Sequence, residues 1–324
     1  MTARDPAFVA ALREALRGTV LEDETLGRYT TFRIGGPATV VLPEDPEDAG
    51  VAVGLAARAG VPWFALGLGS NVLLPDEGLD ALVIRIGRGL DAVRSAGESW
   101  WLGAGLPAPL AARRTAAAGY AGLHRMVGVP GTVGGGVFMN AGCHGTEWAD
   151  VVRRVTAIDA AGHDLVLDRA AIPFRYRRSG LRDLLVVEVE VVLTPAEPDA
   201  LAGEIRELFS WRQNGTPFNE PCCGSTFTNP VLPPEGHPAG LSTAGQFIEA
   251  AGLKGRRMGG IEISPRHANY FVNTGGGTAA DVLRLIEVAR RAVLDRFGVE
   301  LTPEVKLVDS AGRYQALPTG ASQA

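Results

Sequence analysis

The sequence predicts a mixed α+β fold with two or three domains. The chain has 324 residues, of which 46% are apolar, so it can bury more than one core. A strand, helix, strand pattern over residues 38–66 indicates one α/β unit, and a second runs from a helix near Thr243 to a helix over 278–296. Between them, residues 151–168 show the alternating pattern of a β-hairpin that turns at Ala161-Gly162.

The N-terminal α/β unit is defined by its helix signals. Asp45 followed by Pro46 combines a cap with proline in the first turn, so a helix is expected to begin there and to end near Ala59. Similar patterns predict, in chain order, a helix over 5–17, strands over 38–42, 63–66, 81–86, 91–95 and 100–103, a helix over 107–118, a strand over 184–193, a helix over 198–213, and strands over 260–264 and 269–273.

A glycine-rich stretch, GVPGTVGGGVFMNAG from Gly128 to Gly142, is the most unusual part of the chain. Its valines and Phe138 give it apolar surface to bury, which flexible linkers lack. We therefore expect a buried loop around a large ligand and not an ordinary helix, while a pair of turns between two strands is the simpler alternative. No acidic residue lies between Glu98 and Glu147, and main-chain amides in turns bind anions, so a phosphate or diphosphate fits.

A second glycine loop, GLGSNV at Gly67–Val72, follows the strand over 63–66, where open α/β sheets bind ligands. GAGLPA at Gly103–Ala108 has a similar pattern. A Rossmann site requires a helix directly after the glycines and an acidic residue for the ribose. Pro75 prevents the helix after GLGSNV, and the acid-free interval removes the ribose partner after GAGLPA, so both Rossmann assignments are rejected.

Charge and cysteine content exclude several classes of protein. The 31 Lys and Arg residues against 36 Asp and Glu residues give a formal charge of −5, so nucleic acid and anionic membranes are not expected partners. No apolar run could span a bilayer, and the charged N-terminal helix is not a signal peptide. The odd number of cysteines, without metal-ligand spacing, favours a cytoplasmic protein without a metal.

Three distant segments carry side chains that catalysis uses. FRYRRSG contains Tyr176, Arg177 and Ser179, CCGSTFTNP contains Ser225 and Asn229, and LTPEVK contains Glu304. Each also has a simple structural explanation: an arginine in a salt bridge, a serine in a turn, and an acid on a solvated strand face.

Together the motifs resemble one family. YTTFRIGGPA, GLGSNVLLPDEG, GVPGTVGGGVFMNAG, FRYRRSG, GSTFTNP, AGLKGRRMGG, HANYFVN and LTPEVK occur in the order of the UDP-N-acetylenolpyruvoylglucosamine reductases (MurB), over residues 25–308. The chain is most similar to the shorter type, which lacks an additional substrate-domain loop. This resemblance implies a flavin fold of the vanillyl-alcohol-oxidase (PCMH) type plus a separate α/β substrate-binding domain.

The resemblance also implies a division of the chain. Residues 1–66 would form a first FAD-binding subdomain and residues 67–200 a second, joined by a returning strand over 299–309. Residues 201–298 would form the substrate-binding domain. The tail over 310–324 is expected to be disordered.

The cofactor implied is noncovalent FAD, reduced by NADPH. Its expected binding residues lie in the two glycine-rich segments: Gly67, Leu68, Gly69, Ser70, Asn71, Val72, Gly131, Thr132, Gly134, Gly135, Asn140 and Ala141. The substrate would be a UDP-sugar, the enolpyruvyl ether of UDP-N-acetylglucosamine, and the product UDP-N-acetylmuramate.

Three residues match the family's catalytic positions. Hydride addition to the terminal vinyl carbon of the substrate would produce an enolate. Arg177 would stabilise this enolate with its permanently charged guanidinium, and Ser225 would protonate the carbon next to the carboxylate. Glu304 would either orient the arginine or, when protonated, hold the carboxylate. Expected substrate contacts are Tyr176, Asn229, Lys254 and His267. For the basic residues near Lys254 and His267, an equal alternative to substrate contact is a position on a solvated surface.

The chain departs from the family pattern at a few positions. Thr228 stands where a basic residue is usual, and VLPPEGHPAG lengthens the loop after Asn229. Two other classes remain open: a flavin-dependent sugar or alcohol oxidase of the same fold, and a nonenzymatic flavin- or nucleotide-binding protein. We expect a monomer.

Overall fold

The computed structural model describes residues 1–315 of the chain. Its contacts divide the chain into two compact, discontinuous units. Unit 1 consists of residues 1–24, 38–68 and 80–214, and unit 2 of residues 25–37, 69–79 and 215 onward. The GLGSNV loop therefore changes units between Leu68 and Gly69.

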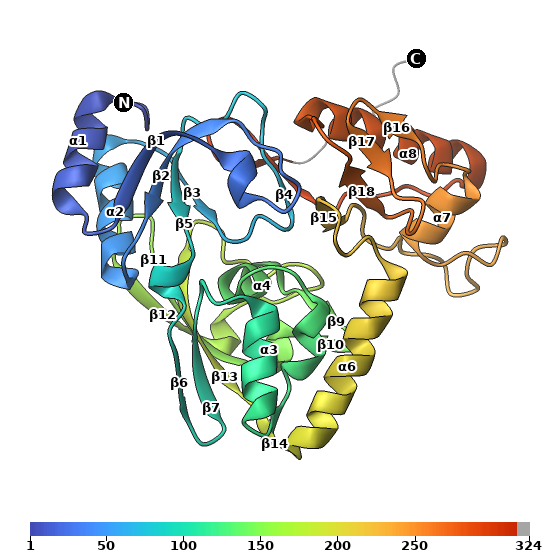
Figure 1. Ribbon diagram of the computed structural model, residues 1–324, viewed down its shortest axis with the longest axis horizontal. Helices are drawn as coiled ribbons and strands as arrows, with labels where there is room; N and C mark the ends of the chain where they lie inside the picture. Colours follow the sequence, from blue (N-terminus) through green and yellow to red (C-terminus); the bar gives the residue numbers. More distant parts are fainter. Residues whose placement is uncertain (316–324) are drawn as a thin grey trace. The chain divides into compact units, whose positions relative to one another are not determined.

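Unit 1 contains most of the helices and strands (Figure 1). Its helices are α1 (Pro6–Ala15), α2 (Pro46–Ala59), α3 (Ala108–Ala117), α4 (Val133–Met139), α5 (Trp148–Val151) and α6 (Pro198–Gly215), with the 3-10 helices η2 (Arg88–Leu90), η3 (His124–Gly128) and η4 (Arg169–Ala171). Its strands are β1 (Thr19–Thr25), β2 (Pro37–Leu42), β3 (Trp63–Leu66), β5 (Leu82–Arg85), β6 (Val93–Ala96), β7 (Ser99–Gly103), β8 (Tyr120–Ala121), β9 (Gly142–Cys143), β10 (Thr146–Glu147), β11 (Val152–Ile158), β12 (Asp164–Asp168), β13 (Leu185–Val192) and β14 (Thr194–Pro195).

Two main sheets organise unit 1. The first has the strand order β1-β2-β5-β3, and β5 pairs in parallel with both β2 and β3. The second has the order β12-β11-β13-β7-β6 and is antiparallel throughout. Helix α4 packs against β13 and β7 of the second sheet. The predicted strand, helix, strand unit and the hairpin over 151–168 are both confirmed.

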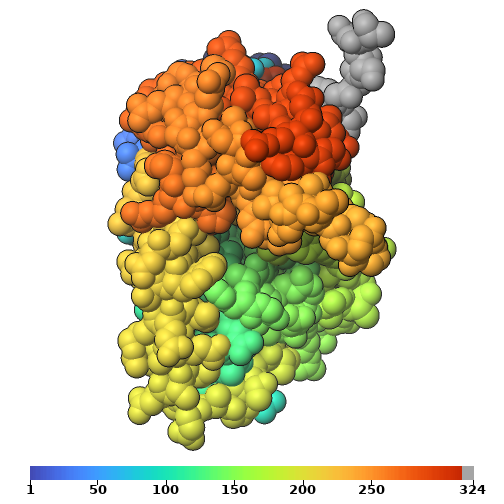
Figure 2. Space-filling view, turned by 90° about the vertical axis from the view of Figure 1, so that its right-hand side faces the viewer, coloured from blue at the N-terminus to red at the C-terminus, as the bar shows by residue number. Residues whose placement is uncertain are grey.

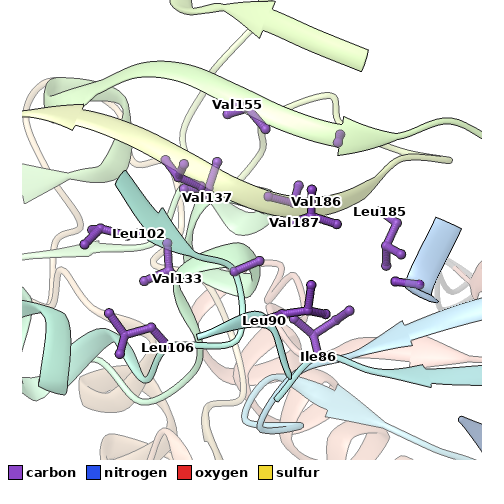
Figure 3. Close-up of a cluster of buried hydrophobic side chains, with 14 of the residues drawn as sticks. Ile86, Leu90, Leu102, Leu106, Val133, Val137, Val155, Leu185, Val186 and Val187 are labelled. Atoms are coloured by element: carbon purple, nitrogen blue, oxygen red, sulfur yellow. The ribbon is translucent and has the colours of Figure 1, made fainter. Parts of the chain in front are cut away.

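The core of unit 1 is aliphatic. Figure 3 shows one part of it, where Val133 and Val137 of α4 lie close to Leu102 and Leu106. All four side chains are buried. At about 25 cal/mol per Å², burying one such valine or leucine contributes roughly 1.5–3 kcal/mol, so the two valines of α4 together contribute roughly 3–6 kcal/mol.

Helix α4 contradicts the expectation of a loop between Gly128 and Gly142. Thr132 caps the helix by accepting a hydrogen bond from the Gly135 amide, and Asn140 ends it in the left-handed conformation at a φ of 45°. Three glycines disfavour an isolated helix by about 1 kcal/mol each relative to alanine. Tertiary packing of Val133 and Val137 overrides that preference.

Unit 2 is built on the C-terminal third of the chain. Its helices are η1 (Leu26–Tyr29), α7 (Ala244–Ala250) and α8 (Ala279–Phe297), and its strands are β4 (Val72–Leu73), β15 (Cys222–Ser225), β16 (Arg257–Met258), β17 (Ile261–Ile263), β18 (Tyr270–Asn273), β19 (Lys306–Val308) and β20 (Tyr314–Gln315). Its sheets have the orders β15-β18-β17-β16 and β20-β19-β4. Phe227, Phe247 and Phe271 lie in a core that also takes in Phe32 from the N-terminal segment.

The compact units divide the chain differently from the predicted domains. The last strand, β19, pairs in parallel with β4, so it returns to residues 72–73 of the predicted second subdomain. Both strands, however, belong to unit 2. Helix α6 belongs to unit 1 and not to the predicted substrate domain; Figure 2 shows it, in yellow, at the surface.

The prediction of a disordered tail from residue 310 is wrong for its first part. Tyr314 and Gln315 form β20, which pairs with Val308 and Leu307 of β19. Residues 316–324 lie outside the described chain. Within residues 1–315, none of the helices is both long enough and apolar enough to cross a membrane.

Candidate functional site

The first half of the GLGSNV loop contacts the second glycine-rich segment in unit 1. Gly67 follows β3, and a Cβ added to it would lie 2.7 Å from Oγ1 of Thr132. Thr132 is buried and caps α4. The structure therefore brings two of the predicted cofactor segments together, with a glycine at the point of closest approach.

The glycines of α4 face different surroundings. An added Cβ at Gly134 would lie 2.8 Å from Cβ of Ala104, and one at Gly136 would collide with the Trp148 indole. Gly135 is exposed, and its added Cβ would meet only Oγ1 of Thr132, at 3.4 Å. Bare backbone is thus open on this side of α4, which fits a large, flat cofactor lying along it.

Asn140, Arg177 and Ser179 connect the end of α4 to the FRYRRSG segment. The Asn140 side-chain amide donates to the Arg175 carbonyl (3.0 Å), and its oxygen accepts from the Ala149 amide (3.0 Å). The Ser179 hydroxyl donates to the Phe138 carbonyl (2.7 Å). Asn140 therefore binds protein backbone with both ends of its side-chain amide. The sequence predicts it only as a cofactor contact.

Arg177 sits at the tip of a two-residue turn. Arg175 and Arg178 exchange main-chain hydrogen bonds of 2.8 and 3.0 Å, which leaves Tyr176 and Arg177 as the central residues. Arg177 has a φ of 55°, in the left-handed region, and its Nη2 donates to the Gly142 carbonyl (3.0 Å). The half-buried guanidinium, 4.8 Å from the exposed Tyr176 ring, is therefore held by the turn and by Gly142.

Cys143 lies beside this arginine. Its thiol donates to the Arg125 carbonyl (3.0 Å). Burial raises the pKa of the Cys143 thiol to about 11, although the positive charges of Arg212 and Arg177 act in the opposite direction. Cys143 is thus a neutral structural thiol at physiological pH.

In unit 2, the second half of the GLGSNV loop is held by the YTTFRIGGPA segment. Gly69 has a φ of 59°, and an added Cβ would lie 2.7 Å from Cα of Thr30. The Thr31 amide donates to the Gly69 carbonyl (3.3 Å), and the Thr31 hydroxyl donates to the Cys222 carbonyl (2.6 Å). Thr31 therefore connects the loop to β15, which ends at Ser225.

Asn71 connects the same loop to the LTPEVK segment. Its carbonyl accepts from the Lys306 amide (3.0 Å), and its side-chain amide donates to the Glu304 carbonyl (3.4 Å). Val72 continues this contact as the parallel partner of Lys306 in β4 and β19. The predicted cofactor residue Asn71 thus lies against the predicted catalytic residue Glu304.

Main-chain hydrogen bonds hold the segments of Ser225 and Glu304 side by side. The Glu304 amide donates to the Thr226 carbonyl (2.8 Å), and the Thr228 amide donates to the Thr302 carbonyl (3.0 Å). Burial raises the pKa of the Cys223 thiol, and the nearby charge of Glu304 contributes to this increase. The stretch that carries Ser225 therefore lies against the Glu304 backbone, and a Cβ added at Gly224 would lie 3.8 Å from the Ser70 carbonyl oxygen.

The expected substrate contacts are more dispersed. The Asn229 side-chain oxygen accepts from the Ala244 amide (3.2 Å) at the start of α7. Lys254 forms a 2.7 Å ion pair with Glu249, and Arg257 pairs with Glu262 at 2.7 Å. The His267 ring accepts from the Asn269 amide (3.2 Å) and packs edge-on against Tyr270. The ion pairs favour the solvated-surface interpretation for Lys254 and Arg257.

Comparisons with known proteins fit this arrangement. Residues 37–168 match the FAD binding domain family, and residues 216–308 match the family described as the C-terminal domain of UDP-N-acetylenolpyruvoylglucosamine reductase. The chain is 46% identical to the UDP-N-acetylenolpyruvoylglucosamine reductase of Rubrobacter xylanophilus, over 88% of this chain and 94% of that protein. It is 40% identical to that of Caulobacter vibrioides, over 91% and 97%.

A solved structure gives the same result. The crystal structure of UDP-N-acetylenolpyruvylglucosamine reductase (MurB) from Thermus caldophilus superposes with a TM-score of 0.74 at 33% identity, covering 90% of this chain and 99% of that chain. The fold and the glycine segments define an FAD-dependent oxidoreductase with the predicted two-part flavin fold. More specifically, the chain belongs to the UDP-N-acetylenolpyruvoylglucosamine reductase family.

Proposed function

We propose that the chain reduces the enolpyruvyl ether of UDP-N-acetylglucosamine to UDP-N-acetylmuramate, with NADPH as the reductant. The two glycine-rich segments would hold FAD, which when bound would supply the hydride chemistry between NADPH and the terminal vinyl carbon of the substrate. Support for this activity comes from family membership together with the main-chain hydrogen bond from Glu304 to Thr226, the residue after Ser225. The three free cysteines fit a reducing cytoplasm, where this reaction would occur.

Arg177 is proposed to stabilise the enolate. Hydride addition to the vinyl carbon places negative charge on the adjacent carbon and on the carboxylate oxygens. A guanidinium remains protonated throughout and presents its donors in a fixed fork. The two-residue turn and the hydrogen bond to Gly142 fix this group before charge develops, which is the condition for electrostatic preorganisation.

Ser225 is proposed to protonate the enolate carbon. A serine hydroxyl is a weak acid in water, but an enolate carbon is a strong base and needs only a positioned donor. The Thr31 contact to Cys222 and the ladder between Thr226 and Glu304 fix the backbone on either side of Ser225. When protonated, Glu304 is proposed to hold the enolic carboxylate. When charged, it is proposed to orient a cation.

The proposed cofactor contacts follow the two glycine segments. Residues Gly67–Val72 would meet the diphosphate, and the stretch from Gly131 to Ala141 would lie along the cofactor, with the exposed backbone at Gly135 on the open side. Tyr176 and Asn229 are proposed to contact the substrate.

Anaerobic rapid mixing tests the proposal. The protein with FAD is reduced with NADPH, mixed with the enolpyruvyl substrate, and followed by flavin absorbance. We expect rapid reoxidation in the wild type and a loss of about 10²- to 10⁴-fold in Ser225→Ala, because general acids contribute on that order. Reduction by NADPH should not change in this variant.

Ser242→Ala is the matched control, since Ser242 is an exposed serine of the same unit. Wild-type reoxidation by substrate in Ser225→Ala would exclude the serine as the acid. Flavin that stays reduced until oxygen is admitted would instead indicate an oxidase, and a protein unable to take up FAD would leave only a binding role.

A further inference from the structure

Arg85, the last residue of β5, lies beside the first residues of the GLGSNV loop. β5 pairs in parallel with β3, in a register that sets Arg85 opposite Leu66. Its Nη1 donates to the carbonyl oxygens of Leu66 (3.0 Å) and Ile86 (3.1 Å), and also to that of Gly67. The half-buried guanidinium of Arg85 thus binds three main-chain carbonyl oxygens at the ends of β3 and β5.

The contact with Gly67 orients the peptide that follows it. In a trans peptide, the C=O and N–H groups point in opposite directions. A Gly67 carbonyl turned toward Arg85 therefore turns the Leu68 amide away from the arginine. Within residues 1–315 this amide has no hydrogen-bond acceptor, and Leu68 is only half-buried.

The charge of Arg85 has a second effect. The carbonyl ends of the two strands carry partial negative charge, which would repel an anion approaching the loop. Arg85 neutralises it, and its guanidinium cannot be deprotonated at physiological pH. The Thr132 side chain also leaves no room for a Cβ at Gly67, which would lie 2.7 Å from Oγ1 of Thr132.

We propose that Arg85 is a positioning residue for FAD: it binds the Gly67 carbonyl so that the Leu68 amide is presented to the cofactor diphosphate. This inference rests on the proposed role of the GLGSNV loop in holding that diphosphate. It extends the cofactor site to a residue 13 positions beyond Val72, outside both glycine-rich segments.

FAD affinity tests the inference without measuring turnover. Holoenzyme is diluted in series, and FAD released from the protein is followed by its fluorescence. Arg85→Met keeps the length of the side chain but removes its donors, and should weaken FAD binding by about 10- to 100-fold, the range for losing a charged hydrogen bond. Arg85→Lys keeps the charge and supplies ammonium donors in place of the guanidinium, and should recover much of the affinity.

Two further variants separate the possible results. Arg154→Met removes an exposed arginine of the same unit and should bind FAD like the wild type. Gly69→Ala strains the loop itself, because Gly69 has a positive φ and contacts Thr30. If Gly69→Ala loses FAD while Arg85→Met and Arg85→Lys keep wild-type affinity, the role of Arg85 is overturned and the loop assignment stands. If none of these variants changes the affinity, the loop assignment fails as well.

Discussion

The side-chain amide of Asn140 donates a 3.0 Å hydrogen bond to the carbonyl oxygen of Arg175. That bond joins the end of α4 to the turn that carries Arg177, and the same side chain accepts from the Ala149 amide. Because the two bonds use different ends of the amide, substitutions can remove them separately.

Asn140→Asp tests this connection. A carboxylate keeps the acceptor for Ala149 but has no donor for the Arg175 carbonyl, so we expect the free energy of unfolding to fall by about 1–3 kcal/mol. Flavin reoxidation by substrate should slow as Arg177 loses its support. Asn140→Gly is the companion variant because it removes both side-chain hydrogen bonds. Glycine tolerates the φ of 45°, so this substitution adds no backbone strain. Wild-type behaviour of Asn140→Asp in urea unfolding and in reoxidation would refute the connection.

Arg177→Lys tests the fixed guanidinium. Lysine keeps the charge but has no planar fork, so we expect substrate-dependent reoxidation to slow by about 10²-fold, comparable to removing one preorganised donor. Arg178→Lys is the matched control, because Arg178 is an exposed neighbour in the same turn. Equal rates in the two variants, measured by rapid mixing, would show that charge alone suffices.

Glu204 of α6 should make stability depend on acid pH. Partial burial alone would raise the pKa of Glu204, but the hydrogen bonds and charges of Arg125 and His124 lower it below its ordinary 4.5. A lowered pKa gives stabilisation that is present above the unfolded value and lost as the pH falls through the folded value. Urea unfolding should therefore show a wild-type advantage over Glu204→Gln at pH 7 that shrinks below about pH 4.5.

Glu207→Gln, an exposed substitution in the same helix, serves as the reference for that experiment. It should leave the pH dependence of unfolding unchanged. An advantage of wild type over Glu204→Gln that is constant from pH 7 to pH 3.5 would mean that the ion pairs do not contribute through the charge of Glu204.

Cys143 and Cys223 should both react more slowly than an ordinary thiol. With the pKa of Cys143 at about 11, its thiolate fraction near pH 8 is about 100-fold below that of a thiol with the ordinary value of 9.0. Labelling with iodoacetamide, resolved by peptide mass spectrometry, should find Cys143 slow and accelerating with pH up to about 11, and buried Cys223 slower still. Rapid labelling of Cys143 at pH 7 would show that the thiol is not buried as described.

Local signals in the sequence predicted the regular elements well. Asp45, Pro46 and Gly60 bound α2 where caps and a left-handed glycine are expected, and the bounds of β3 match the predicted strand. Helix α8 likewise starts after Thr278, whose side chain forms a capping box, and ends at Phe297, before the left-handed Gly298. These elements are set by nearby residues, which is why one sequence suffices.

Other features depend on distant contacts. Helix α4 forms despite its glycines because Val133 and Val137 pack in the core, and β1 reads TVLEDET, a charged stretch without strand alternation. Resemblance to the family identifies the motif residues of the candidate site, but the sequence shows Thr31 only as part of the YTTFRIGGPA motif and Arg85 only as part of the strand predicted over 81–86. Their roles come from carbonyl oxygens of Gly69, Cys222 and Gly67, and no pattern of side chains reports where a carbonyl points.

The pairing of β4 with β19 has a consequence for synthesis on the ribosome. Val72 and Leu73 emerge early, but their parallel partners Lys306 and Leu307 are made much later. Unit 1 lies within residues 1–214, so its chain is made before β19, whereas the second half of the GLGSNV loop must wait for the strand that pairs with it. Chains that stop before residue 306 would lack the backbone partner of Asn71, so under the proposed role of the GLGSNV loop they should not yet retain FAD.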